Sequence, residues 1–222
     1  MPTPTLVSLS RPPLASGAGR APLVVLLHGV GSNERDLMGL APLLDARAFV
    51  VSVRAPNALG RDAFGWFSFA VETDGTRTIQ TAQAEASRLR LLAFLGEFAA
   101  AHPEVDASRT YLIGFSQGAI MAASVLLTEP SRVSGIAMMS GRILPEALAA
   151  RAPDAALAGR PVLVVHGVHD GVLPIANGRA SREALSKLPV ELDYHEFPMA
   201  HEVTAGSFAT VNGWLTRQLD QP

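Results

Sequence analysis

Short apolar runs alternate along the chain with longer segments in which apolar residues recur every three or four positions. Six of these runs are candidate strands, and the first five are almost entirely apolar. Such runs are typical of strands that are buried on both faces of a parallel sheet. The sixth run alternates between apolar and polar residues and is expected nearer to an edge. The candidate strands are 23–27, 49–53, 110–115, 133–139, 162–166 and 191–197.

The segments between these runs have helical spacing. In 78–101 the apolar residues, among them Ile79, Leu89 and Leu92, form one stripe. Strands that alternate with helices predict an α/β fold, with helices on both faces of one mostly parallel sheet. The chain has neither a repeat nor a domain boundary, so a single domain over 1–222 is expected, and the Ala- and Pro-rich segment 144–160 is a candidate mobile loop. The other expected helices are 34–44, 117–127, 176–188 and 203–219.

The composition of the chain excludes some classes of function. The 222 residues are 48% hydrophobic and 17% charged, enough to bury a sizeable core. A formal net charge of -2 and the absence of a basic block argue against nucleic acid as a partner. The lack of cysteine excludes disulfides and thiol chemistry. Because no signal peptide or membrane-spanning run is apparent, we expect a cytoplasmic protein without stable membrane insertion.

A polar Ser-Gln pair interrupts the apolar run YLIGFSQGAI at 111–120. Gly114, Ser116 and Gly118 fit the pattern Gly-x-Ser-x-Gly, and they stand between a predicted strand and a predicted helix. A nucleophile elbow needs this context, because small neighbours allow a sharp turn that presents the serine hydroxyl above the sheet edge. Ser116 is therefore the candidate nucleophile. The alternative is a glycine-rich turn in which Ser116 only caps the helix.

A serine nucleophile needs a base, and the base needs an orienting carboxylate. Asp170 follows a buried strand, so it belongs at the same sheet edge as the elbow. His201 lies in the loop before the last helix, whereas His195 falls within the last strand. The order Ser116, Asp170, His201 is that of the α/β-hydrolases and favours His201 as the base. The alternatives are a solvated turn aspartate and a histidine that caps a helix at the surface.

Two other motifs suggest other kinds of site. His166 and His169 with Asp170 suggest a metal site, but the spacing spans a strand end and a turn, so we expect no metal and no other cofactor. The run LHGVG at 27–31 could aim a backbone amide at an oxyanion, which makes the N–H groups of Val30 and Gln117 the candidate donors. A phosphate-binding loop is the rival interpretation of this run. Glu34 stands where a dinucleotide fingerprint would have its third glycine.

Together these motifs resemble the phospholipase/carboxylesterase family of α/β-hydrolases, which includes the acyl-protein thioesterases. The form of the first motif looks more like the bacterial carboxylesterases. Ala119 and Ala200 stand where family members often have glycine, which puts local packing in question more than chemistry. The motifs that carry the resemblance are LLHGVGSNERDL at 26–37, GWF at 65–67, GFSQG at 114–118, SGRILP at 140–145, HGVHDGVLP at 166–174 and MAHEV at 199–203.

The resemblance implies a fold without a large cap domain and hydrolysis of a small-molecule ester or thioester through a serine acyl-enzyme. The leading hypothesis is a cofactor-free esterase for small to medium acyl chains. A thioesterase or lysophospholipase would use the same residues, and a non-catalytic binding protein would need none of them. Homodimer formation stays open, and Trp66 and Phe67 could instead be plain core aromatics. The implied acyl groove is lined by Trp66, Phe67, Leu144, Val172 and Met199.

Overall fold

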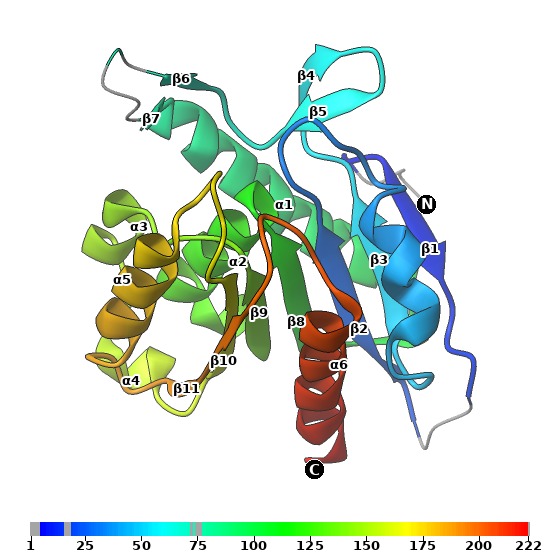
Figure 1. Cartoon of the computed structure of the whole chain (residues 1–222). Coiled ribbons are helices and arrows are strands. Elements are labelled where there is room, and N and C mark those ends of the chain that lie inside the picture. The colour runs from blue at the N-terminus through cyan, green and yellow to red at the C-terminus, as the bar shows by residue number, and fades with distance from the viewer. Residues whose placement is uncertain (1–4, 16–18, 72, 74–76, 222) are drawn as a thin grey trace.

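A computed structural model of the chain describes residues 5–15, 19–71, 73 and 77–221 (Figure 1). Within these residues the main sheet has seven strands in the order β1-β3-β2-β8-β9-β10-β11. All neighbouring strands pair in parallel except β1, which is antiparallel to β3. This arrangement confirms the predicted α/β fold. The strands are β1 (Ser8–Arg11), β2 (Ala21–Leu27), β3 (Phe49–Val53), β8 (Val105–Phe115), β9 (Gly135–Met139), β10 (Pro161–Gly167) and β11 (Glu191–Phe197).

Helices cover both faces of the sheet. Because successive side chains of a strand point to opposite faces, Val25 and Leu27 of β2 pack in one apolar cluster and Val24 and Leu26 in another. The first cluster includes residues of α1, α2, α3 and α5, and the second includes residues of α6 and of the 3₁₀ helix η1. The helical elements are η1 (Leu37–Leu43), α1 (Thr81–Ala101), α2 (Gln117–Thr128), η2 (Pro130–Arg132), α3 (Pro145–Ala149), α4 (Asp154–Leu157), α5 (Ile175–Leu185) and α6 (Ala205–Asp220).

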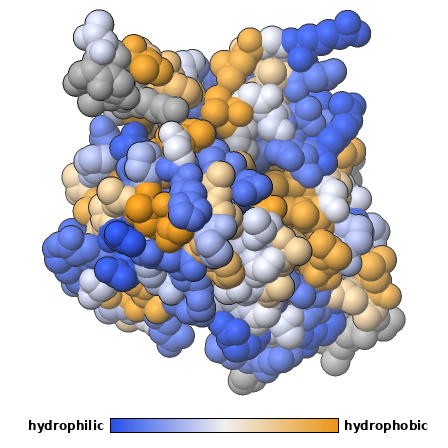
Figure 2. All heavy atoms as spheres, in the orientation of Figure 1, coloured by the Kyte–Doolittle hydropathy of each residue, from blue (hydrophilic) through white to orange (hydrophobic). Residues whose placement is uncertain are grey.

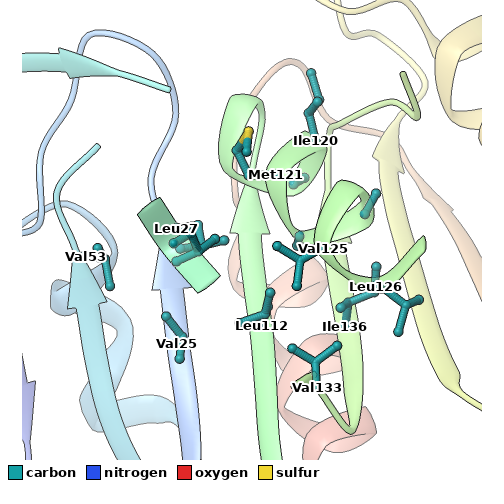
Figure 3. Packing of buried hydrophobic residues seen from close by; sticks show 14 of the residues in the cluster. Val25, Leu27, Val53, Leu112, Ile120, Met121, Val125, Leu126, Val133 and Ile136 are labelled. Atoms are coloured by element: carbon teal, nitrogen blue, oxygen red, sulfur yellow. The ribbon is translucent and has the colours of Figure 1, made fainter. Parts of the chain in front are cut away.

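Helix α2 lies deepest in the fold and follows the elbow directly. Eleven of its twelve residues are buried, all except Thr128. Figure 3 shows Val125 next to Leu112 of β8, while Ile120 points away from the strands at the upper end of the helix. A helix that is apolar all round is stable only when neighbours cover it on several sides. Its first turn is therefore held rigidly against the sheet.

Several local predictions differ from the structure. The segment 34–44 forms a 3₁₀ helix over Leu37–Leu43, with Pro42 inside it, because proline lacks the N–H that an α-helix uses. The segment 144–160, which is a candidate mobile loop from its sequence, instead has the helices α3 and α4, which bury Ala147 and Leu157. The pattern also missed two hairpins outside the main sheet. These are β4 (Asn57–Gly60) with β5 (Ala63–Gly65), and β6 (Phe69–Val71) with β7 (Arg77–Ile79).

The prediction that 191–197 lies near an edge is confirmed, since β11 pairs only with β10 and is the last strand in the order. The parallel strands end at a common edge, and the loops that follow β2, β8, β10 and β11 meet there. In the part of the chain that the structure describes, no helix is long and apolar enough to cross a membrane.

Candidate active site

Ser116 stands at the turn between β8 and α2 in a conformation that few residues adopt. Its φ is +53° and its ψ is -117°, a region that is strained for any residue with a Cβ. A Cβ on Gly118 would collide with the Leu27 carbonyl, and one on Gly114 would collide with the backbone of Gly118. The Ser116 N–H donates to the Met139 carbonyl at 2.9 Å, which fixes the turn against β9. Only a sequence with glycine at both flanking positions can form this turn.

Asp170 is held in the loop after β10. Its side chain is fully buried, and its Oδ1 accepts hydrogen bonds from the N–H groups of Val172 and Leu173, both at 2.8 Å. A buried carboxylate needs such donors, because an unpartnered charge away from water is costly. The two bonds fix one oxygen of the carboxylate and leave Oδ2 facing His201.

His201 lies in the loop between β11 and α6, drawn in orange in Figure 1. Its Nδ1 is 2.7 Å from Asp170 Oδ2, and its Nε2 is 3.0 Å from Ser116 Oγ. Because a carboxylate can only accept, the proton sits on Nδ1, and the Nε2 lone pair faces the serine hydroxyl. The Phe115 ring packs against the imidazole, with the ring centres 4.9 Å apart. The three predicted residues therefore form one hydrogen-bonded chain.

His195, the rival for the base, lies elsewhere. It is in β11 and pairs with Asp193 of the same strand, with 2.8 Å between Nε2 and Oδ1, and 42% of its side chain is exposed. The two candidate bases, His195 and His201, thus differ in their position relative to the end of β11. A residue inside the strand cannot reach over the edge as a loop residue can.

The loop after β2 brings Gly29 and Val30 beside the elbow. A Cβ on Gly29 would come within 3.3 Å of Ser116 Cβ, so the backbone passes close to the serine. Neither the Val30 N–H nor the Gln117 N–H has a hydrogen-bond acceptor among residues 5–15, 19–71, 73 and 77–221. Both residues line the same cavity as Ser116. The two predicted donors therefore belong to residues that line the cavity of the hydroxyl, and their N–H groups have no acceptor among the described residues.

Hydrogen bonds of the His28 side chain hold the start of this loop in place. Its Nε2 accepts the Ala55 N–H at 3.0 Å, and its Nδ1 is 2.7 Å from the Gly29 carbonyl. Burial lowers the pKa of His28, which keeps the ring neutral with its proton on Nδ1. The Trp66 indole N–H donates to the His28 carbonyl at 3.0 Å. These contacts fix the strand end from which Val30 projects.

The Gln117 side chain has a role that the sequence did not predict. It is buried, its Oε1 accepts the Trp66 N–H at 2.9 Å, and its Nε2 donates to the Phe67 carbonyl at 2.7 Å. The residue after Ser116 thus clamps the GWF segment to the start of α2. The signal was present in the sequence, because a polar amide in an otherwise apolar run needs buried partners.

Glu34 lies in the same loop and ties it to Arg54, which follows β3. Arg54 binds it in two places, with Nε to Oε2 at 2.6 Å and Nη2 to Oε1 at 2.7 Å, and only 3% of the Glu34 side chain is exposed. The hydrogen bonds from the Arg54 guanidinium lower the pKa of Glu34. A buried carboxylate at this position is opposite to what a phosphate-binding loop needs.

A cavity of about 570 Å³ opens in front of the serine, a volume typical of small-molecule sites. Phe67 and Val172, two of the expected groove residues, line it, whereas Trp66, Leu144 and Met199 do not. The sequence missed Phe69 and Ile79 of the β6–β7 hairpin, as well as Ile120 and Arg142. Figure 2 shows hydrophobic residues, coloured orange, next to the grey atoms at the upper left. The lining residues are Gly29, Val30, Phe67, Phe69, Ile79, Phe115, Ser116, Gln117, Ile120, Arg142, Val172, Leu173, Pro174, Asn177 and His201.

The three misplaced groove residues have structural roles. Trp66 is fully buried in the core, where its indole supports the loop after β2. Met199 is buried on the opposite face of the sheet, in the cluster that includes α6. Leu144 is buried against the core and lines a smaller pocket of about 280 Å³ between α3 and α5. Their expected place in the groove is thus corrected, since neighbours in sequence point to different sides.

His166 and His169, the two histidines of the possible metal site, lie in different surroundings. His166 is buried, and its Nε2 is 2.8 Å from the Leu173 carbonyl, so it donates its proton there and supports the Asp170 loop. His169 is exposed. Among the residues with described positions, no group of three or more His, Asp or Glu side chains could hold a metal ion.

The two departures from the common family motifs are both accommodated. Ala119 is fully buried, and Gly141 packs against it so closely that a Cβ at position 141 would lie 2.5 Å from the Ala119 Cβ. The extra methyl group in α2 is thus matched by a glycine in the facing loop. Ala200 is exposed, and its N–H bonds to Glu202 Oε1 at 3.2 Å.

Comparison with known proteins shows which protein family this chain is related to. The family model described as Phospholipase/Carboxylesterase matches residues 15–218. The chain belongs to this family. It is 31% identical to Esterase YpfH of Escherichia coli over 168 residues, covering 73% of this chain and 68% of that protein. The crystal structure of esterase PE8 superposes with a TM-score of 0.81 at 30% identity, covering 96% of this chain and 98% of that one.

A relative with a different kind of substrate in its name is Acyl-protein thioesterase 1 of Gibberella zeae. It is 32% identical over 114 residues, which cover 50% of this chain and 48% of that protein. Membership of the family confirms the resemblance seen in the sequence, including the fold without a large cap. The chain is a hydrolase of an esterase family that has thioesterase relatives.

Proposed function

We propose that the chain is a serine esterase that hydrolyses carboxylic esters of small to medium acyl chain through an acyl-enzyme on Ser116. The observation that carries the proposal is the hydrogen-bonded chain from Ser116 Oγ through His201 to Asp170 Oδ2. It lies at the mouth of a largely apolar cavity. The substrate is a small molecule, and no cofactor takes part.

In the proposed reaction Ser116 Oγ attacks the acyl carbon while its proton passes to His201 Nε2. Asp170 holds the imidazole in the orientation that accepts this proton and stabilises the imidazolium that forms. The N–H groups of Val30 and Gln117 bind the negative oxygen of the tetrahedral intermediate. His201 then protonates the departing alcohol, and a water molecule, deprotonated by His201, releases the acid from Ser116.

A thioesterase is the second candidate. The specific observation in its favour is the relationship to an acyl-protein thioesterase. A thiol leaves without needing full protonation, so the same three residues serve that reaction. Comparing a thioester with the ester of the same acid, at matched acyl length, separates the two activities.

The test of the proposed function uses Ser116→Ala and a fluorophosphonate probe. The variant should lose 4-nitrophenyl butyrate hydrolysis by about 10⁴-fold or more and should not be labelled, because it lacks the only atom that attacks. Ser124→Ala is the matched control, since Ser124 is a buried serine of α2 outside the cavity. Labelling that survives in Ser116→Ala, with an unchanged thermal melt, would place the nucleophile elsewhere. Turnover that is sensitive to EDTA would contradict the metal-free mechanism.

A further inference from the structure

Arg142 is the unusual residue of the cavity. It is half-buried and lines the same cavity as Ser116. Within the described residues its side chain makes no hydrogen bond and no ion pair. Some other arginines of the chain have carboxylate partners, for example Arg54 with Glu34 and Arg179 with Glu196. An unpaired guanidinium inside a ligand cavity calls for a functional explanation.

The surroundings of Arg142 favour a negative ligand. No aspartate or glutamate is among the residues that line the cavity, and apolar side chains such as Phe67 and Ile120 form much of its surface. A charge interaction near such surface is stronger than in bulk water, because the effective dielectric constant is lower. A guanidinium is also weakly hydrated and binds carboxylate and phosphate oxygens in pairs.

The position of Arg142 sets where a bound anion would lie. It lines both the main cavity and the adjoining pocket of about 280 Å³ between α3 and α5, and Asn177 does the same. Arg142 thus marks the junction of the two spaces, whereas Val30 and Gln117 line the main cavity alone. An anionic group held there belongs to the distal part of a substrate rather than to the reacting carbonyl.

We propose that Arg142 is a specificity-determining residue that selects ester substrates carrying an anionic group, a carboxylate or a phosphate, at the end remote from the scissile bond. This inference rests on the proposed esterase function, for which it names the substrate class. Arg142 takes no part in bond making, so its contribution is to the affinity for one class of ester.

The test uses matched pairs of esters that differ only in the distal group. On the acyl side these are the 4-nitrophenyl monoester of glutaric acid and the corresponding ester of glutaric acid monoamide. On the alcohol side they are 4-acetoxybenzoate and 4-acetoxybenzamide. For each pair the ratio of kcat/KM for the anionic ester to that for the amide is measured, after subtraction of spontaneous hydrolysis.

Arg142→Gln should lower this ratio by about tenfold or more in the pair whose anionic group reaches residue 142, since hydrogen bonds to charged groups are the strong ones. Arg142→Lys should lie between wild type and Arg142→Gln. Arg20→Gln is the matched control, because it removes the same charge from an exposed residue at the opposite edge of the sheet, before β2. The wild-type ratio should also fall as salt is added, because ions screen the attraction.

The ratio distinguishes specificity from general damage, because a misfolded cavity lowers both members of a pair. An equal ratio in wild type and Arg142→Gln for both pairs would overturn the inference, while Ser116-dependent turnover of the amides would leave the esterase function standing. If none of the four esters is hydrolysed, the proposed function fails and the inference fails with it. The pair that responds tells whether the anion lies on the acyl or the alcohol side.

Discussion

Two regions meet at the cavity, and they are built in different ways. The strand-edge group, Ser116, Asp170 and His201, comes from turns that directly follow β8, β10 and β11. The cavity wall, here Phe67 and Phe69 with Ile79, comes from a connecting segment and a hairpin outside the main sheet. Each member of the strand-edge group has a hydrogen bond that fixes it. The difference suggests that chemistry is fixed by the sheet, whereas substrate selection is left to segments that can vary.

The largest effect is expected from the strand-edge group. His201→Ala should lower kcat/KM for 4-nitrophenyl butyrate by about 10⁴-fold or more, and adding Ser116→Ala should make it little worse, because residues that act as a unit give non-additive losses. His195→Ala is the control, since that ring is exposed and pairs with Asp193. A crippled His195→Ala beside an active His201→Ala would assign the base to the strand instead of the loop.

The second prediction concerns Trp66, which lies beneath the wall and not in it. Trp66→Ala should lower the free energy of unfolding by about 3–5 kcal/mol, because it empties a fully buried site. Trp66→Phe should cost less, since it keeps most of the volume and loses only the N–H bond to the His28 carbonyl. Urea unfolding measures both. A folded Trp66→Ala with normal stability and an altered chain-length preference would return Trp66 to the groove.

The strand-edge group could be predicted from the sequence, because its positions follow from topology. Buried apolar runs reveal parallel strands, and the polar residue after such a run must stand at the common edge. This pattern predicts that Ser116, Asp170 and His201 lie in neighbouring loops at one edge of the sheet. The pattern also distinguishes His201 from His195, since only His201 follows a predicted strand.

The wall could not be predicted in the same way. Trp66 and Phe67 are adjacent in sequence, yet one is buried in the core and the other lines the cavity. The direction of each side chain depends on the Gln117 amide, which clamps the backbone between them. Phe69 and Ile79 lie in short strands of three residues, too short for an alternating pattern to be recognised. Here tertiary contacts, not periodicity, decide what faces the substrate.

The third prediction tests how the loop that carries Val30 is fastened. Glu34→Gln should lower stability at neutral pH by about 1–3 kcal/mol, because it weakens the two bonds from Arg54. The Arg54 guanidinium lowers the pKa of Glu34 from its ordinary 4.5. The stabilisation is therefore present above that ordinary value and is lost as the pH falls through the lowered pKa of the folded state.

Unfolding curves measured from neutral to acidic pH should thus show wild type and Glu34→Gln converging as the acid strength increases. Glu183→Gln serves as the control, because Glu183 pairs with Lys187 on the exposed surface of α5 and its removal should change little at any pH. A gap between wild type and Glu34→Gln that stays constant across the whole range would show that the charge of Glu34 is not what fastens the loop.

The smallest effect, and the one that probes the wall itself, is expected from Phe67. If the acyl chain lies against this ring, each added CH₂ that is buried there contributes about 0.8 kcal/mol, or about fourfold in kcat/KM. Phe67→Ala should then flatten the rise of kcat/KM across 4-nitrophenyl esters from acetate to octanoate. The clamp should survive the change, because Gln117 Nε2 binds the Phe67 carbonyl and not its side chain.

The way in which kcat/KM of Phe67→Ala depends on acyl chain length tests the division between the strand-edge group and the cavity wall. A uniform loss over all chain lengths would mean that Phe67 supports the strand-edge group, and the boundary drawn between chemistry and wall would be wrong at that point. An unchanged slope would mean that the ring faces the alcohol side of the ester. Ile79→Ala then becomes the informative partner, because Ile79 lines the same cavity from the β6–β7 hairpin. A flattened slope in either variant, with Ser116 labelling by fluorophosphonate intact, would locate the acyl chain without disturbing the nucleophile.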